Sequence, residues 1–483
     1  MSSIRKSLTT GVFYTALAKY SGIFISIIIG AILARLLTPD EFGIVALVTV
    51  FVSFFNLLSD FGIGPAVVQN QTLTDEDIQS IFSFSILIGI ILAGIFFMIA
   101  PLIAQFYNRH ELIQVSRVLS ISILFFSWQI VPYALFQKAL KFKQIGLITL
   151  GVQLFSGIIA IILAYAGFSY YALVVQSILA SGITLVLFFI LNPIKIAFKV
   201  QKKSIEKIIR FSSFQFMFNF INYFSRNADN ILIGKFFSSS ALGYYDKSYR
   251  LMMVPVQNLT HVITPVLMPV LSKFQDDKRM VVDSYSKVTK LLATIGFPLS
   301  VFLYFSASEI IYILYGSQWE QSIPIFKLLA LTVGIQVVLS STGSIFQAIN
   351  RTDLLFYSGL LSAFFMVGGI CYGIFVGKSL ESIGYGLIVA FIINFFQTFY
   401  MLIHVALKES VKIFFKPFFF PILTSVIMML IFWTLRRIYP DEIVLSFIFK
   451  LLTAGLIFCT LFLSQNENRA LIKNRWKNIK IKE

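Results

Sequence analysis

Long apolar stretches with few charged residues follow one another along the whole chain, and short polar segments separate them. Most reach about 20 residues, the length at which an α-helix crosses a lipid bilayer. We therefore predict an all-α, polytopic membrane protein with about fourteen transmembrane helices. The predicted spans are 11–35, 41–59, 79–104, 112–134, 145–166, 169–191, 210–234, 241–270, 285–314, 322–348, 354–377, 383–407, 417–437 and 442–464.

The composition supports lipid as the solvent for most of the 483 residues. Hydrophobic residues make up 58% of the chain and charged residues only 13%, whereas soluble domains carry roughly 25% charged residues. The net charge of +17 would suggest nucleic acid in a soluble protein. In a membrane protein it fits basic cytoplasmic loops that contact anionic lipid headgroups. We therefore expect membrane lipids as partners and no nucleic acid.

The distribution of lysine and arginine between the predicted loops predicts the orientation of the chain. With fourteen spans both termini lie on one side, where the loops and termini carry 25 Lys and Arg residues against 6 on the other side. Cytoplasmic loops carry the excess of basic residues, so we expect both termini in the cytoplasm. The first apolar run is too long for a signal-peptide core, and we interpret it as an uncleaved first span.

Short segments repeat at a spacing of about 200 residues, and this pattern predicts the domain organisation. Residues 34–43 resemble 234–243, 106–108 resemble 314–316, and 135–137 resemble 345–347. We predict two six-helix lobes, residues 1–209 and 210–409, then two appended helices in 410–464 and a basic cytoplasmic tail at 465–483. Both lobes begin with an odd-numbered span, so the repeat is parallel. Parallel halves usually enclose a cavity that opens alternately to the two sides, which predicts transport.

Charged side chains inside the predicted spans are the candidates for substrate binding, because a charge in lipid is costly and usually faces water. They are mostly cationic: Lys19, Arg226, Lys247 and Arg250. Together they predict a cationic cavity for an anionic substrate. Pairing of Arg226 with Asp229, and of Arg250 with Asp246, in a packed bundle is the alternative. Lys290, Lys327 and Lys450 lie near helix ends, where we expect them to snorkel toward water.

The seventh predicted span also carries a polar stripe that is unsuited to a lipid-facing surface. Its members fall on one helical face and are Asn219, Asn222, Asp229 and Asn230, beside Arg226. Such a face packs against another helix or lines a cavity. We favour a cavity lining.

Motifs for catalysis, cofactors and metals are missing from the sequence. It contains no phosphate-binding loop of the Walker type, no HExxH pair and no GxSxG elbow. Cys371 and Cys459 both lie in apolar runs, where cysteine usually behaves as a small hydrophobic residue. We predict neither an enzyme nor a cofactor, and no metal site. Transport energy would come from an ion gradient, the membrane potential, the substrate gradient or a separate subunit.

Several segments resemble the polysaccharide transporters of the multidrug/oligosaccharidyl-lipid/polysaccharide exporter superfamily, which are the O-antigen and exopolysaccharide repeat-unit flippases. The similar segments are 32–43, Asp60-Phe61-Gly62-Ile63-Gly64, Val68-Gln69, 229–235, Ala241-Leu242-Gly243-Tyr244-Tyr245 with Pro255, and Tyr315-Gly316 with Trp319. The resemblance extends from about residue 5 to 465. It implies two six-helix lobes in a V shape with two extra helices.

The resemblance also implies a substrate and a location. Such a protein flips an undecaprenyl-pyrophosphate-linked oligosaccharide to the outer leaflet of the bacterial cytoplasmic membrane by alternating access, for surface polysaccharide synthesis. The cations would then meet the diphosphate, with Lys19 and Arg226 as first choices and Arg250 next. Lipopolysaccharide O-antigen and exopolysaccharide are the products implied, and a polysaccharide polymerase and glycosyltransferases are the protein partners.

Four other functions remain open from the sequence. A drug or metabolite exporter of the same superfamily would share the fold, although such exporters often use acidic residues within the membrane. A flippase for the peptidoglycan precursor would differ mainly in the headgroup. A membrane-embedded polysaccharide polymerase or ligase would need a large external loop, which the predicted spans leave no room for. A scaffold without transport activity would not need charges inside its spans.

Overall fold

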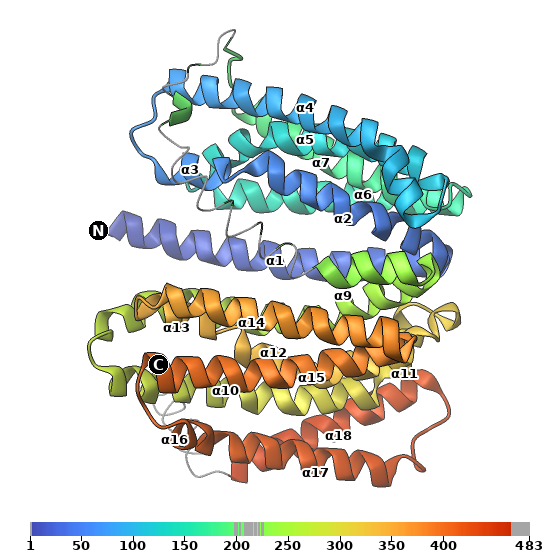
Figure 1. The fold of residues 1–483 in the computed structure, drawn as a ribbon, viewed down its shortest axis with the longest axis vertical. Helices are drawn as coiled ribbons and strands as arrows, with labels where there is room; N and C mark the ends of the chain where they lie inside the picture. Colours follow the sequence, from blue (N-terminus) through green and yellow to red (C-terminus); the bar gives the residue numbers. More distant parts are fainter. Residues whose placement is uncertain are drawn as a thin grey trace. The chain divides into compact units, whose positions relative to one another are not determined.

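The computed structural model describes residues 2–197, 201, 204–206, 216, 220, 223 and 227–464, and every regular element in these ranges is helical (Figure 1). Side chains are described in the same ranges except at 2–15, 261–263, 265, 266 and 413. The chain forms two compact units, Met1–Gly243 and Tyr244–Glu483. The predicted all-α fold is confirmed.

Unit 1 contains the first seven helices, in which α4 packs on α5, α1 packs on α6, and α7 contacts both α5 and α6. The helices are α1 (Ser2–Leu36), α2 (Pro39–Asp60), α3 (Ile63–Gln69), α4 (Asp75–Tyr107), α5 (Glu111–Lys138), α6 (Phe142–Tyr165) and α7 (Tyr171–Leu191). Residues 227–236 are also helical. The predicted hairpin between α6 and α7 turns at Gly167, whose φ of 85° lies in the left-handed region that glycine adopts without strain.

Unit 2 is built around α12, which packs on both α10 and α15, while α17 and α18 cover α10 and α11. Its helices are α9 (Ser239–Leu271, which begins in unit 1), α10 (Lys278–Phe305), α11 (Ala307–Leu314), α12 (Ser322–Leu339), α13 (Thr342–Ala348), α14 (Thr352–Cys371), α15 (Leu380–Phe399), α16 (Val411–Phe415), α17 (Phe419–Leu435) and α18 (Ile443–Ser464). Short 3₁₀ segments lie at Ser272–Phe274, Ser317–Trp319 and Lys416–Phe418, and π-helical turns at Tyr372–Gly377 and Tyr400–Ala406.

Twelve helices within the described residues are long and apolar enough to cross a membrane. They account for twelve of the fourteen predicted spans, so the count of fourteen stays a prediction. The predicted span 210–234 lies largely outside the described residues. The predicted span 241–270 is present as α9, but α9 carries Asp246, Lys247 and Arg250 and is not among the twelve.

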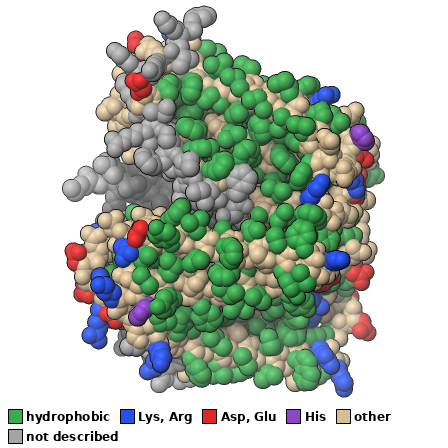
Figure 2. Space-filling model, viewed as in Figure 1, with side chains coloured by type: hydrophobic (Ala, Val, Ile, Leu, Met, Phe, Trp, Pro, Cys, Tyr) green, Lys and Arg blue, Asp and Glu red, His purple; other side chains and the backbone are tan. Residues whose placement is uncertain are grey.

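Two of the spans begin at capping boxes, and helices of both units present apolar side chains outward. Thr38 and Glu41 form a capping box at the start of α2, and Thr74 with Asp77 forms another at the start of α4. Large exposed apolar residues are spread over the helices of both units. In each unit, Figure 2 shows hydrophobic side chains along the helices and charged ones toward the helix ends. An apolar surface of this extent is suited to contact with lipid.

Both units are continuous in sequence, and the boundary between them falls at Gly243, near the start of α9. The lobes that the repeat predicts, 1–209 and 210–409, with the appended pair 410–464 and the tail 465–483, remain predictions. Residues 465–483 lie outside the described part of the chain.

Candidate substrate-binding site

The eight predicted site residues are distributed over both units. Lys19, Asp229 and Asn230 belong to unit 1, and Lys247 and Arg250 belong to unit 2. Arg226, Asn219 and Asn222 lie outside the described residues. The predicted pair of Arg226 and Asp229 therefore also lies outside the described part of the chain.

Lys19 lies on the exposed side of α1. The opposite side packs on α6, where Gln153 Nε2 donates a hydrogen bond of 2.9 Å to the Gly22 carbonyl oxygen and Ile29 fills the space beside Gly157. This packing fixes which face of α1 is turned away from the bundle. A lysine exposed inside an apolar span is costly in hydrocarbon, so its position fits a surface that water reaches.

Arg250 has an exposed side chain, although it forms an ion pair with a neighbouring residue of the same helix. Its Nε lies 2.6 Å from Asp246 Oδ2 on the preceding turn of α9, so the pairing that the sequence offered as the alternative to substrate binding is present. The Arg250 side chain is 63% exposed, whereas that of Asp246 is 14% exposed. Asp246 thus holds one edge of the guanidinium, and the two terminal amino groups have no protein partner among the described residues. This arrangement leaves the outer edge of the guanidinium for bidentate binding of an oxyanion.

Lys247 has a different environment, although it lies on the same turn of α9. It is buried, and its Nζ lies 5.3 Å from the ring centre of Tyr315 and 5.8 Å from that of Trp319. Tyr315 and Trp319 also contact each other, with ring centres 5.7 Å apart. The two aromatic rings stabilise the ammonium group by cation–π interactions. Lys247 is therefore enclosed by protein in this structure, in contrast to Arg250.

Asp229 and Asn230 form a local polar pair in the helical segment 227–236. Asp229 is buried, and its Oδ1 accepts a hydrogen bond of 2.8 Å from the backbone N–H of Asn230. The Asn230 side-chain oxygen is also buried and has no hydrogen-bond partner in the described structure. A buried amide oxygen without a partner costs free energy.

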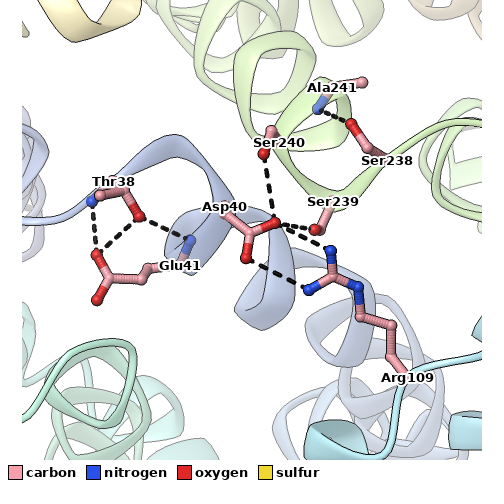
Figure 3. A network of polar contacts seen from close by, with 8 residues as sticks. All are labelled: Thr38, Asp40, Glu41, Arg109, Ser238, Ser239, Ser240 and Ala241. Atoms are coloured by element: carbon pink, nitrogen blue, oxygen red, sulfur yellow. Dashed lines mark hydrogen bonds and ion pairs between the residues drawn. The ribbon is translucent and has the colours of Figure 1, made fainter.

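A polar network fixes the start of α2 within unit 1 (Figure 3). Asp40 accepts hydrogen bonds from Arg109, at 3.1 and 3.3 Å, and from Ser239 and Ser240. On the other side of the same turn, Glu41 completes the capping box with Thr38. Asp40 therefore holds the first residues of α9 and the end of α4 against the start of α2.

The two segments that this network joins are the ones that the internal repeat relates. Gly43 and Gly243 approach the opposite backbone so closely that a Cβ atom at Gly43 would lie 1.8 Å from the Ser239 carbonyl oxygen. A Cβ atom at Gly243 would lie 2.1 Å from the Pro39 carbonyl oxygen. The repeated glycines therefore have a common physical role, which is to let the two helix starts pack backbone against backbone.

One buried ion pair was not predicted from the sequence. Lys450 on α18 donates to Glu309 Oε1 on α11, Ser446 donates to the same oxygen at 2.7 Å, and Lys450 donates to the Phe305 carbonyl oxygen at 2.8 Å. Both charged side chains are buried. The expectation that Lys450 snorkels to water is therefore wrong, because a buried carboxylate and a carbonyl oxygen satisfy it inside the protein.

The described residues contain no group of three or more His, Cys, Asp or Glu side chains that could hold a metal ion. The twelve apolar helices among the described residues show that the chain is a multi-pass membrane protein.

Comparison with known proteins defines the family. A model of the polysaccharide biosynthesis protein family matches residues 32–324, and this chain belongs to that family. The teichuronic acid biosynthesis protein TuaB of Bacillus subtilis (strain 168) is 28% identical over 370 residues, which cover 75% of this chain and 76% of TuaB. The lipopolysaccharide biosynthesis protein WzxC of Escherichia coli (strain K12) is 24% identical over 405 residues, which cover 81% and 80% of the two chains.

A similar fold occurs among solved structures. The structure of the lipid II flippase MurJ in an inward closed conformation matches with a TM-score of 0.75 and 17% sequence identity, over 95% of this chain and 99% of that one. At this identity the match establishes the fold. The family and the fold that the sequence motifs predict are therefore both confirmed.

Proposed function

We propose that this protein is a flippase that moves a polyprenyl-pyrophosphate-linked oligosaccharide across the cytoplasmic membrane by alternating access, for surface polysaccharide synthesis. Membership of the polysaccharide biosynthesis family supports the pathway class. The fold shared with a lipid II flippase supports the transport mechanism. By this proposal the protein moves its substrate without changing a covalent bond, so it is not an enzyme.

The observation that carries the proposal is the exposed guanidinium of Arg250 within a long helix. Arg250 lies about three turns into α9, roughly 16 Å from the first residue of the helix at 1.5 Å per residue, so its charge lies inside the predicted span 241–270 and not at the end of the helix. Asp246 orients it and leaves its outer edge unoccupied. Lys19 is another exposed cation within an apolar span. Both charges suit a diphosphate better than they suit a cationic drug.

The proposal has further parts that follow from the sequence. The source is a bacterial cell, the protein lies in its cytoplasmic membrane, and both termini face the cytoplasm. The six-helix lobes 1–209 and 210–409 carry out the alternating motion, and 410–464 accompanies the second lobe. A polysaccharide polymerase uses the flipped product, and glycosyltransferases supply the substrate. Arg226, Asn219 and Asn222 complete the proposed polar lining together with Asp229 and Asn230.

The orientation predicts the result of topology mapping. A reporter that is active only in the cytoplasm should be active when fused after Lys203, and inactive when fused after Lys378. The physical reason is the excess of basic residues in the loops on the side of Lys203. The opposite pattern of activities would contradict the proposed orientation.

Substitution of the exposed cations is expected to reduce transport without lowering the amount of protein. For Arg250→Gln we expect a decrease of at least about tenfold, because hydrogen bonds to charged groups contribute about 1.5–3 kcal/mol. Lys19→Gln should also reduce transport. Lys287→Gln, which removes an exposed charge from the first half of α10, is the matched control. Equal transport by all three variants would exclude Lys19 and Arg250 from the substrate site.

Deletion of the gene tests the proposed function in cells. We expect intact lipid-linked repeat units to accumulate while surface polysaccharide is lost, and the wild-type gene to reverse both changes. The accumulated sugar would identify the substrate. Normal surface polymer without an accumulated intermediate, in a strain that lacks other flippase genes, would contradict the proposal.

A further inference from the structure

A small hollow lies in unit 1 where α5 ends, α6 begins and α7 ends. Its volume is about 290 Å³, and it is lined by Leu135, Phe136, Lys138, Ala139, Lys141 and Asn192. All three helices are among those that can span the membrane. The hollow therefore lies at the depth where a helix leaves the hydrocarbon and meets the lipid headgroups.

Two lysines at this hollow are held in place by uncharged groups. Lys138 Nζ donates a hydrogen bond of 2.7 Å to the Asn70 carbonyl oxygen, and Lys141 Nζ lies 5.1 Å from the ring centre of Phe136. In the described structure neither lysine pairs with a carboxylate. Their positive charges are thus not neutralised by the protein.

The surroundings of the two lysines are rigid. Phe136 and Phe188 are fully or almost fully buried, and their ring centres are 4.9 Å apart. The turn between α5 and α6 is tight, since Leu140 has a φ of 55° and the Lys141 N–H donates to the Phe136 carbonyl oxygen. This turn places Lys138 and Lys141 on the same hollow. The charges are therefore preorganised, which lowers the entropic cost of binding a ligand.

Two further features of the hollow are suited to an anion. α6 begins after Lys141 without a side-chain cap, and the first N–H groups of a helix attract negative charge. Asn192 adds a half-buried amide group to the lining. The attraction of Lys138 to the carboxyl end of α5 explains the position of that one residue, but it does not explain why Lys141 and Asn192 lie around the same hollow.

The surface next to the hollow is apolar. Large exposed hydrophobic residues lie on the same turn and helices, namely Leu140, Leu147, Ile190 and Leu191. A ligand that occupies the hollow with an anionic group would therefore have apolar surface beside it for hydrocarbon chains. This combination distinguishes a lipid from a free anion.

We propose that this hollow, lined by Lys138, Lys141 and Asn192, binds the phosphate headgroup of an anionic membrane phospholipid. Basic pockets between transmembrane helices at the membrane surface commonly bind such headgroups. The site is independent of the proposed transport function, and it is separate in sequence from Lys19 and Arg250. It would make the behaviour of unit 1 depend on the lipid composition of the membrane.

Lipid binding to the purified full-length protein tests the proposal. The protein is placed in nanodiscs of phosphatidylcholine with increasing phosphatidylglycerol, and bound phosphatidylglycerol is measured by native mass spectrometry. A lysine near the membrane surface contributes about 1 kcal/mol to binding of anionic lipid, so Lys138→Ala/Lys141→Ala should weaken the selective binding by roughly 30-fold. The corresponding double arginine variant should retain it. Lys143→Ala, which removes a charge beside the hollow but not in its lining, is the matched control.

Four results would overturn the proposal. Unchanged phosphatidylglycerol binding in the double alanine variant would show that the hollow is not the site. An equal loss in Lys143→Ala would show a general effect of charge. Displacement of the lipid by millimolar inorganic phosphate would assign the hollow to free phosphate. Loss of polyprenyl diphosphate binding in the double alanine variant, without loss of phosphatidylglycerol binding, would assign it to a polyprenyl diphosphate. Circular dichroism of each variant verifies that it is folded.

Discussion

Replacing Gly43 by alanine is expected to destabilise the protein by about 3 kcal/mol, the upper part of the usual range for overpacking. The added methyl group would lie 1.8 Å from a backbone oxygen of Ser239. No change of side-chain rotamer can relieve a clash with backbone, so the start of α9 must move away from α2. That movement would also disturb the hydrogen bonds from Ser239 and Ser240 to Asp40. Thermal unfolding followed by fluorescence-detected size-exclusion chromatography measures the effect.

Two other glycines in helices provide the control for this substitution. Gly30 in α1 and Gly94 in α4 have no atom within 4 Å of the position that a Cβ would take. Alanine at these positions raises helix propensity by about 1 kcal/mol without a clash, so Gly30→Ala and Gly94→Ala should be neutral or stabilising. If Gly43→Ala were as stable as Gly30→Ala and Gly94→Ala, the close packing between the start of α2 and the start of α9 would be contradicted.

Removing one partner of the buried Glu309–Lys450 pair is expected to destabilise unit 2 by about 3–5 kcal/mol, because the other charge is left buried without a partner. Both side chains are almost fully enclosed, with 10% and 9% exposure. The pair joins α18 to α11, so its loss should release the C-terminal helices α17 and α18 from the rest of the unit. Limited proteolysis in the loop between α17 and α18, together with thermal unfolding, reports both effects for Lys450→Met and Glu309→Gln.

The double variant Glu309→Met/Lys450→Met separates the charge effect from packing. Replacing both members of a buried ion pair by apolar residues of similar size is often neutral or stabilising. We therefore expect the double variant to be more stable than either single variant. The double variant could instead lose as much free energy of unfolding as the two single variants together. In that case the two side chains would stabilise the protein by packing and not by mutual neutralisation.

Much of the fold could be predicted because lipid imposes a simple pattern on the sequence. Spans of sufficient length and low charge identified every one of the twelve apolar helices. The same criterion is weakest for α9, where Asp246, Lys247 and Arg250 interrupt the apolar pattern. The span 241–270 was still predicted from its apolar residues, and the internal repeat separately relates the start of α9 to the start of α2.

The candidate site was predictable only in part, because helical spacing reports pairs within one helix and not contacts between helices. The i,i+4 spacing of Asp246 and Arg250 predicted their ion pair. Lys247 is equally charged and only three residues from Arg250, yet Tyr315 and Trp319 enclose it. Glu309 and Lys450 are 141 residues apart, so no local pattern indicated that Lys450 is buried.

Transfer of a lipid-linked oligosaccharide in proteoliposomes directly tests the proposed flippase activity. The lipid-linked intermediate from the deletion strain is labelled on its sugar with a fluorophore and reconstituted into both leaflets of liposomes together with the purified protein. A membrane-impermeant reductant then quenches only the label in the outer leaflet. We expect the wild-type protein to make the inner pool accessible and Arg250→Gln to slow this transfer strongly. An accessible pool that is the same with and without correctly inserted wild-type protein would contradict the flippase proposal.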